Sequence, residues 1–280
     1  MPAPLNPVDL RELAVRLAIA AGEELLTRQR SLSIDAAGVE TKSSASDPVS
    51  AADRASEKLI TDGLTAARPD DGLLGEEGAS RPSSTGLTWV IDPLDGTVNY
   101  LYGRPDWCVS IAVEDEDGAL AGVVHQPRTG TTWSAARGAG AYRADTTPYQ
   151  TVWYGGLRLG LERQTRLETA LVCTGFSYLP ERRAEQAAVL QDLLPAVRDL
   201  RRGGSAALDL CSVADGTADA YYEHVIQPWD IAAGALIARE AGARLGGLRG
   251  GRESPELLIA APPGLYEELA AALREAGLDA

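Results

Sequence analysis

The stretch Trp89–Thr97, WVIDPLDGT, decides the fold prediction, because it marks the point where a buried strand reaches the surface. Three apolar residues predict a strand, and Asp92 and Asp95 follow at once with a proline between them. A turn would need only one Asp and one Gly. A carboxylate at the end of an apolar strand is partly buried, and a buried charge requires compensation. The pair of acids therefore predicts a bound group at this strand end.

Around this stretch the chain alternates strands and helices, which predicts an α/β protein built in layers. We expect helices over 8–30, 50–67, 181–199, 205–215 and 228–242, with a last helix after 262, and strands over 88–91, 107–113, 120–126, 170–176, 218–223 and 256–262. Residues 131–143 predict a hairpin. The polar segment 144–151 suggests a soft boundary between subdomains 1–146 and 147–280 of one compact unit.

The composition argues against several classes of partner. The 280 residues carry a formal charge of −14, so the surface repels nucleic-acid backbones and anionic membranes. An anionic small substrate would be repelled as well, unless cations are bound in the site. Cys108, Cys173 and Cys211 lack CxxC spacing, which fits a reducing compartment rather than a disulfide framework or a zinc site.

The first expected helix, 8–30, is amphipathic, with charged residues distributed among the apolar ones. It is neither a signal peptide nor a membrane span, and no apolar run approaches the length of a span. We therefore expect a cytoplasmic protein.

Several patterns that could indicate other functions are better explained as ordinary structure. The acidic run 114–118, EDEDG, lacks the terminal Glu of a calcium loop and predicts a solvated turn. The run 138–143, GAGAYR, fails the dinucleotide-binding pattern and predicts a hairpin, and the glycines at 246–251 predict turns. His125 and His224 are the only histidines, and neither accompanies a GxSxG serine, which argues against a Ser-His-Asp hydrolase.

The remaining candidates for a site are all acidic: Asp47, Asp53, Glu76, Glu77, Asp92, Asp95 and Asp230. Each one alone could be a helix cap or a turn residue. A role as a cap or turn residue does not suffice for Asp92, because it ends an apolar strand and its charge is partly buried. A bound Mg²⁺ would compensate the negative charge of these carboxylates. Mg²⁺ takes oxygen ligands and is usually shared between a few carboxylates and a substrate phosphate. Two metals roughly 3.5–4 Å apart can hold the attacking and leaving oxygens of a phosphoryl transfer.

The residues after Asp92 suit such a site. Pro93 fixes the direction of the chain, so that the Leu94 carbonyl can turn inward and Asp95 can return to the same pocket. Gly96 allows a close approach of the backbone, and the amides of Gly96 and Thr97 at a helix start suit a phosphate.

Three motifs, GEE at 75–77, DPLDGTVNY at 92–100 and PWDIAAG at 228–234, resemble the signatures of the inositol monophosphatase family. The resemblance extends to KSSASDPVSAAD at 42–53 and to GGSAALDLCSVADGTADAYYE at 203–223, so it covers nearly the whole chain in the family's order. It implies a layered αβαβα fold of the inositol monophosphatase and fructose bisphosphatase type. It also implies dependence on Mg²⁺, inhibition by lithium and a homodimer.

The resemblance also implies a role for each acid. Glu76, Asp92 and the Leu94 carbonyl would hold one metal, and Asp92, Asp95 and Asp230 a second. Glu76 with waters would hold a third, weaker ion. Most metal ligands would then lie in subdomain 1–146.

For the reaction, the resemblance implies that Thr97 and Asp53 orient and deprotonate the attacking water, with help from Glu77. Glu223 is similar to a family residue that binds inositol hydroxyls, and Lys42 lies on a loop that closes over the site. The substrate contacts implied are those of Gly96, Thr97, Asp95, Ser205, Ala206, Glu223 and Asp230.

We therefore expect a Mg²⁺-dependent phosphomonoesterase acting on myo-inositol monophosphates. Gln227–Pro228 stands where animal members often carry His-Cys. The alternatives are the same chemistry on fructose bisphosphate, histidinol phosphate or a nucleotide 3′-phosphate, or a non-enzymatic role in a transcription complex.

Overall fold

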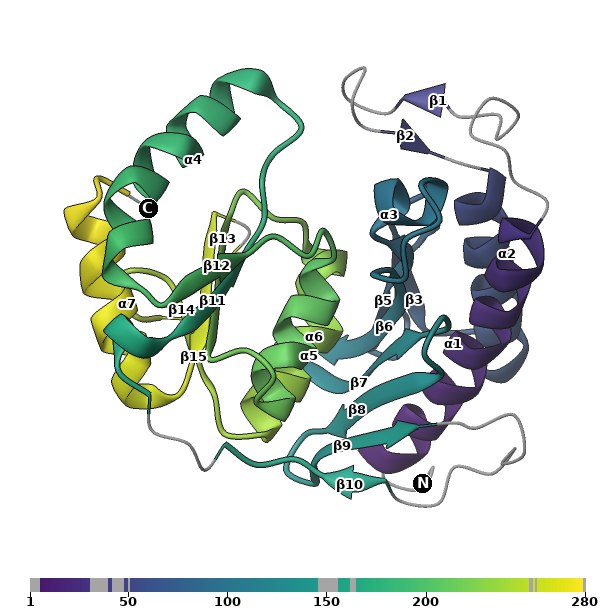
Figure 1. Ribbon diagram of the computed structural model, residues 1–280. Coiled ribbons are helices and arrows are strands. Elements are labelled where there is room, and N and C mark those ends of the chain that lie inside the picture. The colour runs from purple at the N-terminus through teal and green to yellow at the C-terminus, as the bar shows by residue number, and fades with distance from the viewer. Residues whose placement is uncertain are drawn as a thin grey trace.

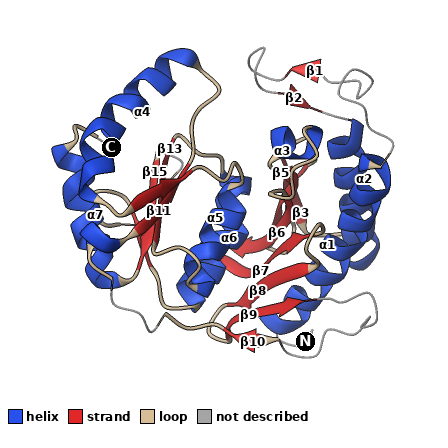
Figure 2. Ribbon diagram, in the orientation of Figure 1, coloured by secondary structure: helices blue, strands red, loops and turns tan. Residues whose placement is uncertain are grey.

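The computed structural model describes residues 6–30, 40–41, 48–49, 51–145, 156–161, 165–251, 254 and 256–278. Helices and sheets alternate in layers across the molecule (Figures 1 and 2). Two helices, α1 (Pro7–Gln29) and α2 (Ala51–Ala67), cover an eight-stranded sheet, and α5 (Ala206–Asp215) and α6 (Pro228–Glu240) lie in the middle. A five-stranded sheet follows, and α4 (Pro180–Leu193) and α7 (Pro263–Glu275) cover its outer face. This order confirms the predicted layered αβαβα fold.

The eight-stranded sheet is antiparallel except for one parallel pair, β3 with β5. Its strands in spatial order are β10 (Leu157–Arg158), β9 (Gly140–Asp145), β8 (Thr131–Ala136), β7 (Gly118–Gln126), β6 (Cys108–Asp115), β5 (Thr88–Asp95), β3 (Gly72–Gly75) and β4 (Ser80–Arg81).

The central strand β5 is buried on both faces, which explains its unbroken apolar start. Successive side chains of a strand point to opposite faces. Trp89 and Ile91 accordingly pack in the core beneath α1 and α2, whereas Val90 packs in the core around α5 and α6. The middle helices approach the sheet closely, because a Cβ at Gly122 of β7 would lie 2.9 Å from the Cα of Ala233 of α6.

The five-stranded sheet is mixed, with β11 parallel to both β12 and β13, and β15 antiparallel to β13 and β14. Its order is β12 (Asp199–Arg201), β11 (Leu171–Thr174), β13 (Ala220–His224), β15 (Leu257–Ala261) and β14 (Arg244–Gly246). The remaining elements are β1 (Glu40–Thr41), β2 (Pro48–Val49), α3 (Thr97–Leu101), η2 (Leu167–Thr169) and η3 (Leu194–Ala196).

One predicted element is wrong over part of its length. The helix expected over 181–199 ends at Leu193, and a 3₁₀ turn, Leu194–Ala196, and the edge strand β12 follow it. Pro195 explains the end of the helix, because proline lacks the backbone donor that would continue the helical hydrogen bonds and its ring clashes with the carbonyl four residues earlier. The sequence analysis also did not predict the short strands β1, β2, β3, β4, β10, β12 or β14. The other boundaries differ from expectation by a few residues, as is usual for helix and strand ends.

Two further expectations concern the boundary between the subdomains and the question of a membrane span. The boundary expected between 146 and 147 falls in the segment 146–155, outside the described residues, so the division into subdomains stays a prediction. None of the described helices combines the length and the apolar character needed to cross a membrane.

Candidate functional site

The site begins where β5 leaves the sheet. β5 pairs with β6 as far as Asp92 opposite Ser110, and the register then shifts before Asp95 pairs with Cys108. Pro93 lies within this irregularity, where its missing N–H removes a rung of the ladder. The Leu94 amide donates to Asp92 Oδ1 at 3.0 Å, which closes a tight turn. The turn directs Asp92 and Asp95 into one cleft, as predicted.

This acidic cleft has a volume of about 370 Å³ and lies between the two halves of the chain. It is lined by carboxylates from three distant parts of the sequence, Glu76 after β3, Asp92 and Asp95 on β5, and Asp230 on α6. The predicted residues that also line it are Leu94, Gly96, Thr97, Ser205, Ala206 and Glu223.

The carboxylates of the acidic cleft lie close together and are buried or half-buried. Asp92 is only 1% exposed. Burial raises the pKa of Asp92 well above its usual value, and Glu76, Asp95 and Asp230 raise it further by charge repulsion. Burial likewise raises the pKa of Asp230 well above the usual range, with Asp95 as the next cause. Such a cluster holds its negative charge only when a positive charge joins it.

Asp95 is held by the N-terminus of α5. Its Oδ2 accepts hydrogen bonds from Ser205 Oγ at 2.6 Å and from the Ala207 amide at 2.8 Å. Burial raises the pKa of Asp95, while the bonds from Ser205 and Ala207 oppose that rise. Ser205 also caps α5 by accepting from the Leu208 amide. The two halves of the chain are thereby joined at the predicted metal ligand.

Asp230 serves as a helix cap as well as a cleft residue. One of its oxygens, Oδ2, accepts from the Gln227 amide at 3.0 Å within a capping box at the start of α6. Asp230 is therefore a helix cap, as the sequence allowed. This role does not prevent its carboxylate from also serving as a ligand in the cleft. The same carboxylate also lines the acidic cleft.

The catalytic pair expected from the resemblance lies side by side. The Thr97 hydroxyl is within 3.3 Å of Asp53 Oδ1 and 3.2 Å of the Leu94 carbonyl oxygen. Asp53 is fully buried in the first turn of α2. Gly96 precedes Thr97 with φ +92°, and a Cβ there would lie 2.8 Å from the Asp106 carbonyl oxygen, so only glycine fits.

Three other residues singled out from the sequence, Glu77, Lys42 and Asp47, are not among the described residues that line the cleft. Glu77 is half-buried beside the cleft and is not one of its lining residues; its amide donates to Glu57 Oε2 at 2.9 Å. Lys42 and Asp47 lie outside the described residues, so their place relative to the cleft stays a prediction.

Glu223 lies against the backbone of the neighbouring strand. Its Oε2 accepts a hydrogen bond from the Tyr221 hydroxyl at 2.9 Å, so these two side chains share a face of β13. A Cβ added at Gly175 would lie 1.9 Å from that oxygen. Burial raises the pKa of Glu223 to about 7, the Tyr221 bond lowers it, and Asp95 raises it. Glu223 is half-buried, so it is not a solvated strand end.

The acidic cleft also contains residues that the sequence analysis missed. Asp209, on the inner side of α5, is buried beside Glu223, and burial with repulsion from Glu223 and Asp95 raises its pKa to about 8. An acid inside the otherwise apolar run ALDLC was a signal that could have identified it. Arg202 is the only cationic side chain among the described residues that line the cleft.

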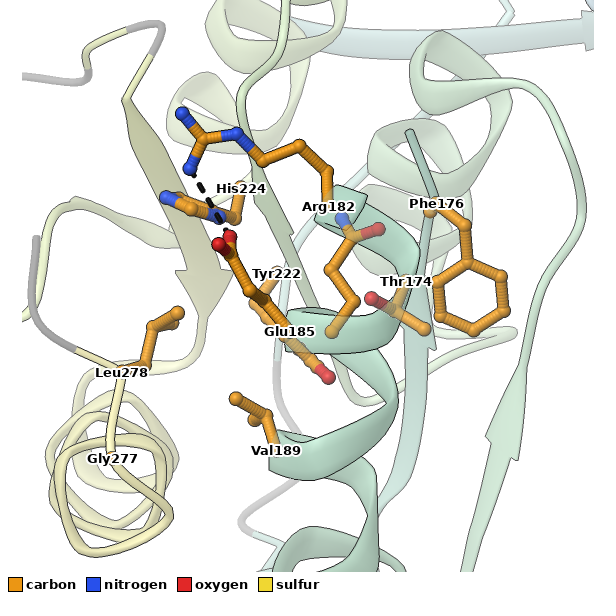
Figure 3. A pocket seen from close by; sticks show the side chains of 11 residues that line it. Thr174, Phe176, Arg182, Glu185, Val189, Tyr222, His224, Gly277 and Leu278 are labelled. Carbon is orange, nitrogen blue, oxygen red and sulfur yellow. Dashed lines mark hydrogen bonds and ion pairs between the residues drawn. The ribbon is translucent and has the colours of Figure 1, made fainter. Parts of the chain in front are cut away.

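A second cavity, of about 250 Å³, lies under α4 on the outer face of the five-stranded sheet (Figure 3). It shares Gly175 and Phe176 with the acidic cleft. Its one acid, Glu185, pairs with Arg182 at 3.1 Å, and the figure shows both beside His224. None of the predicted site residues lines this cavity.

The patterns dismissed from the sequence are structural. EDEDG forms the turn between β6 and β7, where Arg137 binds Asp115 with both terminal nitrogens. His125 is buried against Thr132 in the sheet, and burial lowers its pKa to about 4. His125 does not line the acidic cleft.

The donor set of the acidic cleft fits a hard divalent cation. All its predicted ligands are oxygen atoms, the kind that Mg²⁺ prefers, and burial disfavours their negative charge. Over the described ranges, no three acidic, histidine or cysteine side chains already stand in coordinating geometry. One oxygen of Asp92, one of Asp95 and one of Asp230 accepts a hydrogen bond from a backbone amide.

Comparison with known proteins agrees with this geometry. The model of the inositol monophosphatase family matches residues 6–278. The inositol-1-monophosphatase of Mycobacterium leprae is 44% identical over 96% of this chain and 94% of its own. The Nus factor SuhB of Pasteurella multocida is 38% identical over 82% of this chain and 83% of its own. The crystal structure of the extragenic suppressor protein suhB of Bartonella henselae superimposes with a TM-score of 0.86 at 34% identity, covering 96% of this chain and 100% of that one. The chain therefore belongs to the inositol monophosphatase family of phosphatases.

Proposed function

We propose that the protein is a Mg²⁺-dependent phosphomonoesterase that hydrolyses myo-inositol monophosphates to inositol and phosphate. One observation carries the proposal: the buried carboxylates of Asp92 and Asp95 and the half-buried carboxylate of Asp230 share a cleft with Glu223, a carboxylate suited to binding hydroxyl groups. An acidic cleft binds a phosphate only when cations neutralise it. The family and its relatives' names support the same reaction.

The metal sites follow from the oxygens that face the cleft. Glu76, Asp92 and the Leu94 carbonyl form one candidate site, and Asp92 with Asp95 and Asp230 forms the second. A third and weaker ion is expected at Glu76. When bound, Mg²⁺ neutralises the phosphate and lowers the pKa of bound water.

The chain's own contribution to the reaction is to position a water molecule. Because the Thr97 hydroxyl can donate its proton to Asp53 Oδ1, its lone pairs remain able to accept from a water in the cleft. Asp53 is the base at the end of this path, since it is buried and in contact with Thr97. Glu77 is proposed to assist from the neighbouring turn.

The leaving group is expected on the side of Glu223. Tyr221 occupies one oxygen of Glu223, and the carboxylate retains acceptor capacity for two neighbouring hydroxyls of a ring. Ser205 and the backbone at Ala206 line the same side. A polyol phosphate satisfies these groups, whereas a simple alkyl phosphate offers fewer hydroxyls.

The test is a phosphate-release assay across inositol 1-phosphate, 2-glycerophosphate, fructose 1,6-bisphosphate, histidinol phosphate and a nucleoside 3′-phosphate. We expect the highest kcat/KM with inositol 1-phosphate. Glu223→Ala should reduce that value by about 10–100-fold, as expected for a hydrogen bond to a charged group. The same change should affect 2-glycerophosphate less. Glu185→Ala, in the second cavity, is the matched control and should leave both values unchanged. Equal losses on both substrates in Glu223→Ala would contradict the substrate assignment.

A second candidate function is a non-enzymatic role in a transcription complex, because several relatives carry the name Nus factor SuhB. Absence of turnover on every phosphate ester, with Mg²⁺ present, would favour it. Inhibition by lithium, a homodimer and a cytoplasmic location are finer proposals that rest on the family resemblance.

A further inference from the structure

Val225 has a backbone conformation that its side chain disfavours. It is the only residue other than glycine with positive φ among the described residues, at φ +64°. In this left-handed region a Cβ crowds the backbone, and a β-branched side chain is a genuine outlier there. Such strain persists only where the surroundings impose it, and it is found most often at functional sites.

The surroundings of Val225 fix its backbone without burying its side chain. Its amide donates to the Glu256 carbonyl at 3.0 Å, and it connects the end of β13 to Ile226, which is 2% exposed. The Val225 side chain itself is 43% exposed, so core packing does not explain a β-branched residue at this position. Glycine or asparagine would adopt this φ more easily.

Val225 lines the acidic cleft and lies between two site residues in the sequence. Val225 lies two residues after Glu223 and five before Asp230, and all three line the cleft. Leu179 and Trp229 line it too, so part of the wall is apolar while Glu223 and its neighbours form a polar part. A cyclohexane polyol has the matching surfaces, since its hydroxyls lie at the ring edge and its C–H groups on the faces.

We propose that Val225 is a specificity-determining residue, whose isopropyl group contacts the C–H surface of the leaving group and disfavours a second charged group there. This inference rests on the proposed function and narrows it to neutral polyol monophosphates. A bisphosphate would bring its second phosphate against an apolar side chain and two carboxylates, Glu223 and Asp209, with Arg202 as the only cationic side chain of the described cleft lining.

Two substitutions test the strain through Tm and the contact through substrate preference. Val225→Gly removes both the strain and the side chain, and Val225→Asn relieves the strain but keeps a side chain of similar size that is polar. Both should raise Tm by about 2–5 °C, because both residues tolerate positive φ. Leu157→Asn is the control, since Leu157 is an exposed apolar residue of β10 and does not line the cleft.

The decisive quantity is the ratio of kcat/KM for inositol 1-phosphate to that for fructose 1,6-bisphosphate. We expect this ratio to fall about 3–10-fold in both Val225 variants, in keeping with the modest discrimination of apolar contacts, and to stay unchanged in Leu157→Asn. More stable Val225 variants with an unchanged ratio would overturn the inference, and so would a Tm that does not rise. If the wild-type protein hydrolyses neither substrate, the proposed function fails and this inference with it.

Discussion

Gly175→Ala should displace Glu223 and leave the fold intact. The added Cβ would lie 1.9 Å from Glu223 Oε2, and ordinary contact begins near 3.4 Å, so the carboxylate must move by about 1.5 Å. The atoms in the way are the end of a flexible side chain, which can move without disturbing the backbone. The movement breaks the 2.9 Å bond from the Tyr221 hydroxyl and takes Glu223 away from the position where we expect the substrate.

A displacement of this size has a large effect on turnover. Misplacing a group by about 1 Å can reduce a rate by about 10²-fold. We expect Gly175→Ala to lower kcat/KM for inositol 1-phosphate by about 10–100-fold, close to the loss in Glu223→Ala, and to lower that for 2-glycerophosphate less. Phosphate release gives both values, and thermal denaturation shows whether the variant is folded.

The control is Gly264→Ala, because Gly264 is an exposed residue of α7 and a Cβ there meets no atom within 4 Å. It should keep wild-type kinetics. If folded Gly175→Ala protein has wild-type kcat/KM for inositol 1-phosphate, then Glu223 does not bind the leaving group from this position.

Two other predictions concern the catalytic pair and the acids. Thr97→Ala should lower kcat by about 10²–10⁴-fold, the usual contribution of a positioned proton acceptor, with little change in Mg²⁺ affinity by calorimetry; equal losses would make Thr97 a ligand or a cap. In the protein freed of metal, the raised pKa values of Asp92, Asp230, Glu223 and Asp209 mean that the folded state binds more protons than the unfolded state. The free energy of unfolding should therefore fall as pH rises from about 4 to about 8, and Mg²⁺ should restore it most at pH 8. Denaturant titrations that show a rise instead would contradict this account of the acids.

Much of the fold follows from local patterns in the sequence. WVI before two acids predicts a buried strand and its end, and β5 confirms it. Turn residues and alternation likewise predict the strands of the eight-stranded sheet from β6 to β9. The short strands β12 and β14 were missed because three residues carry too little pattern, and they exist through pairing with β11 and β15.

The site could be predicted only in part, because packing rather than sequence spacing brings several of its residues together. Spacing alone brings Asp92 and Asp95 together, but Asp230 joins them through the packing of α6, and only the family resemblance indicated that. Asp209 is marked in the sequence only as an acid within an apolar run, and its place beside Glu223 comes from the fold. No local pattern marks the conformation of Val225, because the chain on both sides imposes it.

The most direct test of the central claim is phosphate release from inositol 1-phosphate by chelated protein as Mg²⁺ is added back. We expect no turnover in the chelator, recovery with Mg²⁺, and little recovery in Asp92→Asn, which should remain folded. Asp117→Asn, in the turn between β6 and β7, should recover as the wild type does. Full activity in the chelator, or full activity of Asp92→Asn, would contradict the claim that the buried acids bind the catalytic metal.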